Sequence, residues 1–140
     1  MGDRETADYF GQGNKYITEL TPSDFESVAP WRLKGGASGM VLFYAPWCGY
    51  CKRVAPEWEK AAKTVGFCEF YAFNCEKYKD HVMKIKEDTP ELIKGYPSIV
   101  IYKEGSPDEY YDGDRSSKSL VSTCMRTCSK NSKGFCERRS

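Results

Sequence analysis

The chain has 140 residues, which is the length of one folded domain rather than two. Its 21 lysine and arginine residues nearly balance its 20 aspartate and glutamate residues, so no broad basic surface exists to bind nucleic acid or an anionic membrane. Hydrophobic residues make up 40% of the chain, enough for a packed core, and no apolar run is long enough to span a membrane. Seven cysteines, an odd number, are the feature of the composition that needs an explanation.

The two ends of the chain are more polar than its middle. We predict a flexible leader over residues 1–13, a folded domain over residues 14–128 and a polar C-terminal tail over residues 129–140. The leader begins with acids and an arginine instead of the continuous apolar stretch of a signal peptide. Either the protein works where it is made, or the chain is a trimmed part of a longer one, so the compartment stays open.

The first third of the chain predicts a strand, a helix and a second strand. Residues 16–20 alternate between polar and apolar side chains, as a short strand does. Thr21 can cap a helix, with proline at the first helical position and an acid three residues after the cap, and we expect this helix to run through Val28. Residues 40–45 are apolar on both faces, which is typical of a central strand covered by helices.

The rest of the chain predicts a mixed sheet. Apolar side chains recur at helical spacing after Cys51, although Pro56 should kink this helix. The remaining expected elements follow in the order strand, helix, strand, strand and helix, over residues 67–73, 81–85, 97–102, 109–111 and 119–128. This order indicates an α/β domain with about five strands flanked by about four helices.

Two cysteines stand where a strand gives way to a helix. Trp47 is followed by Cys48, Gly49, Tyr50 and Cys51, so Cys48 falls at the helix N-terminus. Backbone amides and the helix dipole favour an anion there, which lowers the pKa of a thiol and makes Cys48 the expected nucleophile. Cys51, one turn further and covered, is the expected resolving thiol.

The cysteine pair has two other interpretations. The pair could be half of a zinc site or two residues of the core. A zinc site needs four ligands, and the other candidates, His81, Cys124, Cys128 and Cys136, are distant in sequence and badly spaced. We therefore expect no metal and no bound cofactor, and we expect His81 to lie on the surface of its helix.

A family resemblance is carried by the residues around these cysteines. Residues 44–52, Tyr-Ala-Pro-Trp-Cys-Gly-Tyr-Cys-Lys, and Ala-Pro-Glu at 55–57 closely resemble the catalytic domain of protein disulfide isomerases, within the thioredoxin superfamily. Residues 95–98, Gly-Tyr-Pro-Ser, resemble the cis-proline loop of that family. The resemblance covers about residues 14–128, nearly all of the foldable chain.

The resemblance implies a thioredoxin fold and a redox-active, catalytic Cys48–Cys51 pair. It also implies a cis peptide bond before Pro97 that faces this pair, where the Tyr96 backbone could bind an extended substrate chain. The residues that it implies in substrate binding are Trp47, Gly49, Tyr50, Tyr96 and Pro97. For Trp47, a pure packing role fits the sequence equally well.

Two departures from the family pattern bear on the chemistry. Tyr50 stands where disulfide isomerases usually have a histidine, so we expect less stabilisation of the Cys48 thiolate and a less oxidising pair. Leu42 and Ala72 stand where the family has a buried acid and its lysine partner. Proton transfer at Cys51 must then use water or another group, and release of a mixed disulfide should be slow. If the register is shifted, Glu69 would supply the acid.

These residues predict a thiol–disulfide oxidoreductase of the protein disulfide isomerase type, which forms, reduces or rearranges disulfides in protein substrates. Its partners would be cysteine-containing proteins and a redox partner such as a sulfhydryl oxidase, glutathione or a reductase, and we expect a monomer. Two alternatives stay open: a thioredoxin-like reductant, and a binding or chaperone module in which the cysteine pair is incidental.

The compartment follows from the cysteines and from the resemblance. Both favour the endoplasmic reticulum lumen or the secretory pathway if the chain is trimmed. A natural start at Met1 would instead fit a cytosolic or viral disulfide system.

The five remaining cysteines have structural interpretations. Cys68 and Cys75 flank a predicted buried strand and are expected to be free buried thiols. Cys124 and Cys128 lie on the apolar stripe of the last helix and are expected to act as small buried hydrophobic residues. Cys136 has no partner that the sequence identifies.

Overall fold

The protein is seen here in a computed structural model that describes residues 7–66 and 68–130, with the side chains of residues 128–130 outside it. The predicted polar tail from residue 131 onward, including Cys136, lies outside the described residues, and so does the side chain of Cys128. Among the residues described, no helix is both long and apolar enough to cross a membrane.

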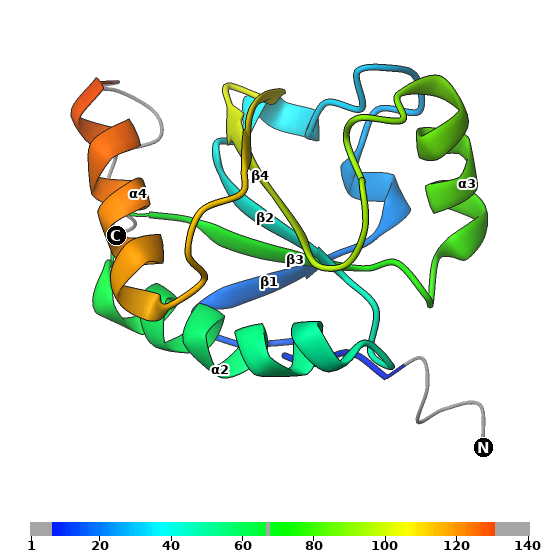
Figure 1. Cartoon of the computed structure of the whole chain (residues 1–140). Coiled ribbons are helices and arrows are strands. Elements are labelled where there is room, and N and C mark those ends of the chain that lie inside the picture. Colours follow the sequence, from blue (N-terminus) through cyan, green and yellow to red (C-terminus); the bar gives the residue numbers. More distant parts are fainter. Residues whose placement is uncertain (1–6, 67, 131–140) are drawn as a thin grey trace.

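A five-stranded mixed sheet forms the centre of the domain (Figure 1). Its strands lie in the order β1-β3-β2-β4-β5. β1 and β2 run parallel to β3, whereas β4 is antiparallel to β2 and to β5. The strands span Ile17–Leu20 (β1), Gly39–Tyr44 (β2), Phe70–Asn74 (β3), Ser98–Lys103 (β4) and Ser106–Tyr111 (β5). The predicted α/β class and five-stranded mixed sheet are confirmed.

Three α-helices cover the two faces of this sheet. α2 (Gly49–Thr64) and α4 (Ser117–Lys130) pack on one face, and α3 (Lys79–Asp88) covers the other (Figure 1). Every residue of β2 is buried because helices lie over both of its faces. The chain leaves β2 at Tyr44 and enters α2 five residues later, so the first turn of α2 begins at one end of the central strand.

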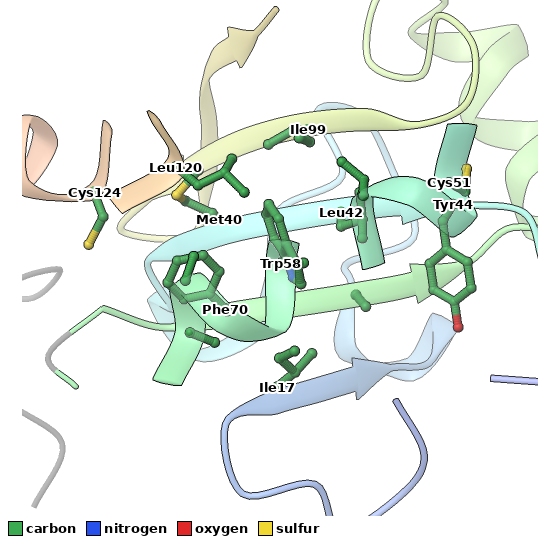
Figure 2. Packing of buried hydrophobic residues seen from close by; sticks show 14 of the residues in the cluster. Ile17, Met40, Leu42, Tyr44, Cys51, Trp58, Phe70, Ile99, Leu120 and Cys124 are labelled. Carbon is green, nitrogen blue, oxygen red and sulfur yellow. The ribbon is translucent and has the colours of Figure 1, made fainter. Parts of the chain in front are cut away.

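Each face of the sheet has its own apolar core. Met40 and Leu42 point toward α2 and α4, where Trp58 and Leu120 cover them (Figure 2). The alternate residues of β2, Val41 and Phe43, point to the other side and pack in a second cluster with α3. The alternation follows from the two-residue period of a strand.

The prediction of a helix after Thr21 is wrong. Thr21 and Asp24 form the expected capping box, with the Thr21 amide donating to Asp24 Oδ2 at 2.8 Å, but only a 3₁₀ turn, η1 (Pro22–Asp24), follows. Phe25 then pairs with Leu33 in an isolated bridge and inserts into the second core. Burial of this ring requires an extended backbone at Phe25, so a continuous helix cannot form. A second 3₁₀ turn, η2 (Lys34–Gly36), precedes β2, and the described residues hold three α-helices instead of about four.

The strand expected over residues 67–73 begins later, at Phe70. Cys68 precedes it and forms a disulfide with Cys124 of α4, with the two Cα atoms 6.4 Å apart. The prediction of a free thiol at Cys68 is therefore wrong, and Cys124 is buried but oxidised. The two residues are 56 positions apart in sequence, and only the packing of α4 beside the entry to β3 brings them together. Cys75 is a free buried thiol, as predicted.

His81 does not lie on the surface of its helix. Its ring contacts those of Phe25, Trp31 and Phe73, with centroids 5.3–5.9 Å apart. Nε2 of His81 is buried and has no hydrogen-bond partner among the described residues. The sequence around His81 is polar, and it does not indicate that Phe25 and Trp31 fold over this position.

The expected flexible leader is packed against the domain in the part that the structure describes. Tyr9 stacks on Tyr44 with ring centroids 4.4 Å apart, and Phe10 packs against the core that lies between the sheet and α2. Asp8 contacts Asn74 and Lys77 at the end of β3. The prediction of a flexible leader is wrong for Asp8, Tyr9 and Phe10. The rings of Tyr9 and Phe10, which the sequence places outside the domain, pack on its apolar surface.

Candidate thiol site

The Cys48 and Cys51 thiols occupy the first turn of α2. Cys48 is the N-cap residue, with an extended backbone, and Gly49 is the first residue of the helix. Both thiols are free; the exposed fraction of Cys48 is 8% and that of Cys51 is 0%. Only Cys48 can therefore be reached from solvent. The free amide groups of the helix N-terminus favour negative charge at this position.

The loop before β4 faces the thiols from a distant part of the chain. The Tyr96–Pro97 peptide bond is cis, as the resemblance implies. The Cys48 thiol donates a hydrogen bond to the Tyr96 carbonyl oxygen at 3.5 Å. The fold thus brings the two separate sequence motifs together at one end of β2.

Aromatic side chains form the rim of the site. Trp47 and Tyr50 are exposed, and the Trp47 ring meets that of Tyr96 edge to face with centroids 6.0 Å apart. The Trp47 indole nitrogen donates to Glu76 Oε1 at 2.8 Å, which fixes the ring at the surface. Open space surrounds Gly49 where a side chain would begin. An extended peptide can therefore approach Cys48 past these rings.

The chain is similar in sequence to known proteins. A family model described as Thioredoxin matches residues 17–126. This chain belongs to the thioredoxin family. The chain is 35% identical over 113 residues to Protein disulfide-isomerase A3 of Gallus gallus, covering 79% of this chain and 20% of that protein. It is 33% identical over 105 residues to Protein disulfide-isomerase like 2-2 of Arabidopsis thaliana, covering 74% of this chain and 22% of that protein.

Solved structures agree with this assignment. The J-Trx1 fragment of ERdj5 matches with a TM-score of 0.64 and 30% sequence identity, covering 80% of this chain and 51% of that one. The chain therefore corresponds to a single thioredoxin domain, and it spans about a fifth of the length of the two curated relatives above.

The position of the family's buried acid is apolar in this thioredoxin domain. Leu42 lies opposite Ala72 on one side and Ile99 on the other, and all three are buried. Glu69 does not replace the acid, because its backbone meets Met40 at the start of β2, at the far end of that strand from Tyr44. The interpretation with a shifted register is therefore wrong.

The Cys51 thiol is held in its protonated form. Burial raises the pKa of Cys51 to about 12, although a backbone hydrogen bond from Ala45 and the charge of Arg115 lower it. Arg115 also lines a pocket of about 290 Å³ along the first half of α2, together with Tyr50, Arg53 and Glu57.

No three His, Cys, Asp or Glu side chains gather as metal ligands within the residues described.

Sequence reasoning missed a buried acid close to this site. Glu19 on β1 is 6% exposed, and its Oε2 accepts hydrogen bonds from the Tyr44 hydroxyl at 2.7 Å and from the Phe10 amide at 3.1 Å. Burial raises the pKa of Glu19 to about 7. A signal was available, because Glu19 lies two residues from Ile17 and a strand places such residues on the same face.

Proposed function

We propose that this thioredoxin domain is a thiol–disulfide oxidoreductase of the protein disulfide isomerase type, with Cys48 as the nucleophile and Cys51 as the resolving thiol. The position of Cys48 carries the proposal. Its sulfur is the accessible one, it sits at the N-cap of α2, and it faces the Tyr96 carbonyl. The sequence identity of the chain to protein disulfide isomerases supports the same reaction.

The reaction proceeds through two sulfur exchanges. The Cys48 thiolate attacks one sulfur of a substrate disulfide; that S–S bond breaks, and the first substrate thiolate leaves and takes up a proton. Cys51 then loses its proton and attacks Cys48, which releases the second substrate thiol. The substrate gains two electrons and two protons, and the domain is left with a Cys48–Cys51 disulfide. The reverse sequence oxidises a substrate dithiol.

The substrate in this proposal is an extended, cysteine-containing segment of a protein. Tyr96 and Pro97 face Cys48, and the Tyr96 backbone binds the segment beside the thiols. Trp47 and Tyr50, exposed on either side of Gly49, supply apolar contact for side chains next to the reacting cysteine. This arrangement selects for an accessible segment rather than for one particular sequence.

Two variants test the assigned roles. Cys48→Ser should abolish refolding of a scrambled, disulfide-bonded protein, because the nucleophile is lost. Cys51→Ser should accumulate mixed disulfides with the substrate, seen on a non-reducing gel after alkylation. Cys75→Ser is the matched control, since Cys75 is also buried and free. Turnover that survives Cys48→Ser, or no trapped adduct with Cys51→Ser, would contradict the proposal.

A thioredoxin-like reductant is the second candidate function. The neutral ring of Tyr50, exposed beside the thiols where a histidine would carry positive charge, favours it. The reduction potential separates the two functions: about −180 mV is typical of protein disulfide isomerase and about −270 mV of thioredoxin. Equilibration of the purified domain with glutathione buffers measures this potential directly.

We also propose that the domain works in the lumen of the endoplasmic reticulum. The Cys68–Cys124 disulfide supports this compartment, because such bonds persist in oxidising surroundings and are rare in the cytosol. Rapid alkylation of cells before lysis gives the test. An oxidised Cys68–Cys124 pair is expected, and a fully reduced pair would contradict the proposed compartment.

A further inference from the structure

The N-terminal segment of Asp8, Tyr9 and Phe10 crosses the loop that leads into the thiols. The single hydrogen of the Tyr9 hydroxyl is shared between the carbonyl oxygens of Ala45 at 3.3 Å and Pro46 at 3.0 Å. The Tyr9 amide donates to the Tyr44 hydroxyl at 3.0 Å, and the two tyrosine rings stack. Tyr9 thus holds Ala45 and Pro46, the two residues that follow β2, through its side chain, and it holds Tyr44, the last residue of β2, through its backbone amide and its ring.

Three strands hold this segment in place. The Phe10 amide and the Tyr44 hydroxyl both donate to Glu19 Oε2, which joins the segment to β1 and β2. On the other side, Asn74 Nδ2 at the end of β3 donates to Asp8 Oδ1 at 3.0 Å. Because the anchors come from three neighbouring strands, the position of the Tyr9 hydroxyl is determined by the sheet.

The loop under Tyr9 is in direct contact with both thiol residues. The Ala45 carbonyl accepts a hydrogen bond from the Cys48 amide at 3.0 Å, and the Ala45 backbone lowers the pKa of the Cys51 thiol. Burial is the main reason why the pKa of Tyr9 is raised, and the nearby Cys51 and Cys48 thiols add to the rise. The phenol therefore keeps its proton at neutral pH and remains a donor to the loop.

We propose that Tyr9 is a positioning residue of the thiol site, which holds the loop at Ala45 and Pro46 so that the Ala45 backbone keeps its position beside the first turn of α2, where Cys51 lies. This inference rests on the proposed function, since it assigns Tyr9 to the step that Cys51 performs. Tyr9 does not touch the substrate and exchanges no proton in this role. Glu19 supports it as the buried anchor of the segment.

Tyr9→Phe isolates the contribution of the hydroxyl group. The variant keeps the ring stacked on Tyr44 and keeps the amide hydrogen bond, so the segment stays in place. Without the two hydrogen bonds the loop is less restrained, and the Cys51 thiolate loses part of its stabilisation. A contribution of one or two ordinary hydrogen bonds corresponds to a slowing of the Cys51 step by about 3- to 10-fold.

The experiment measures the two exchanges separately on the purified full chain. Oxidised glutathione is mixed with the reduced protein, and stopped-flow fluorescence with acid-quenched mass analysis follows attack by Cys48 and ring closure by Cys51. Tyr9→Phe should slow closure by about 3- to 10-fold between pH 7 and 9, while attack by Cys48 changes less than about twofold. Tyr16→Phe, which removes an exposed phenol, is the matched control and should change neither rate.

Closure at the wild-type rate in Tyr9→Phe would overturn the inference. Equal slowing of both exchanges would also overturn it, because a general loss of structure does not distinguish Cys51 from Cys48. The proposed function is tested independently by the wild-type protein. A wild type that fails to rearrange protein disulfides yet closes its own Cys48–glutathione adduct would refute the function and leave the role of Tyr9 measurable.

Discussion

Glu19 is the only charged residue that is buried among those the structure describes. Its Oε1 has no hydrogen-bond partner among them, so ionisation leaves a poorly compensated charge beside the core. Burial therefore raises the pKa of Glu19 to about 7, with Asp8 adding to the rise and Lys77 opposing it. The protonated carboxyl is the form that the folded domain favours.

A raised pKa in the folded state makes stability depend on pH. The contribution of Glu19 is fully present below its unfolded pKa of 4.5, and it is lost as the pH rises through about 7. The free energy of unfolding of Glu19→Gln, relative to that of wild type, should therefore increase by on the order of 3 kcal/mol as the pH rises from 5 to 8. Urea unfolding at both pH values measures this change.

Glu91→Gln is the control for this prediction, because Glu91 is exposed. The control should follow wild type at both pH values. A Glu19→Gln variant whose difference from wild type is the same at pH 5 and pH 8 would show that Glu19 does not titrate between them.

Cys51 dictates the pH dependence of mixed disulfide release. With a pKa near 12, set chiefly by burial, only a small fraction of Cys51 is thiolate at neutral pH. That fraction, and with it the release rate, should rise about tenfold for each pH unit between pH 7 and 9. Quenched-flow decay of a preformed Cys48 adduct measures this slope, and a flat profile would show that another group removes the proton.

At the scale of elements, the Cys68–Cys124 disulfide joins the segment before β3 to α4. This bond closes a long loop of chain, and a loop of this kind typically stabilises a domain by about 2–4 kcal/mol. Cys124→Ala should lower the free energy of unfolding by that amount. Denaturant unfolding measures it, and wild type treated with dithiothreitol should match the variant. A variant as stable as the oxidised wild type would contradict the prediction.

The short turn η1 shows how an element can begin as predicted and still end early. The capping box of Thr21 and Asp24 forms as the local sequence indicates. The helix stops because Phe25 is buried against Phe43 and Phe73, and the energy of burying a phenylalanine ring exceeds the small propensity of a few polar residues for helix. Local signals therefore determine where the turn starts, whereas tertiary packing determines its length.

Across the whole molecule, the two sulfur sites lie at opposite ends of the sheet. Figure 2 shows Cys124 at one end of the core and Cys51 beside Tyr44 at the other. The Cys68–Cys124 disulfide is therefore separated from the Cys48 and Cys51 thiols by the core around Met40, Leu42 and Trp58. The Cys124→Ala variant, although less stable, should keep its exchange rate within about twofold of wild type below its melting temperature.

The amino-acid sequence alone was enough to predict the family and the position of the thiol pair. A cysteine pair after a buried strand, with a proline loop resembling that of disulfide isomerases, identified the family and the thiol site, because these signals depend on local structure and spacing. The α/β class and the succession of strands along the chain followed from hydrophobic periodicity for the same reason, whereas their order within the sheet did not.

Contacts between residues that are distant in sequence are seen only in the folded structure. The Cys68–Cys124 disulfide, the buried Glu19 and the packing of Tyr9 over the loop at Ala45 all join parts of the chain that are far apart in sequence. Such contacts depend on where the helices and the N-terminal segment pack on the sheet. The pattern of residues along a single segment does not contain this information. For the same reason, the prediction of His81 on the surface of its helix and the prediction of Phe25 within a helix are both wrong, because both side chains pack against aromatic rings.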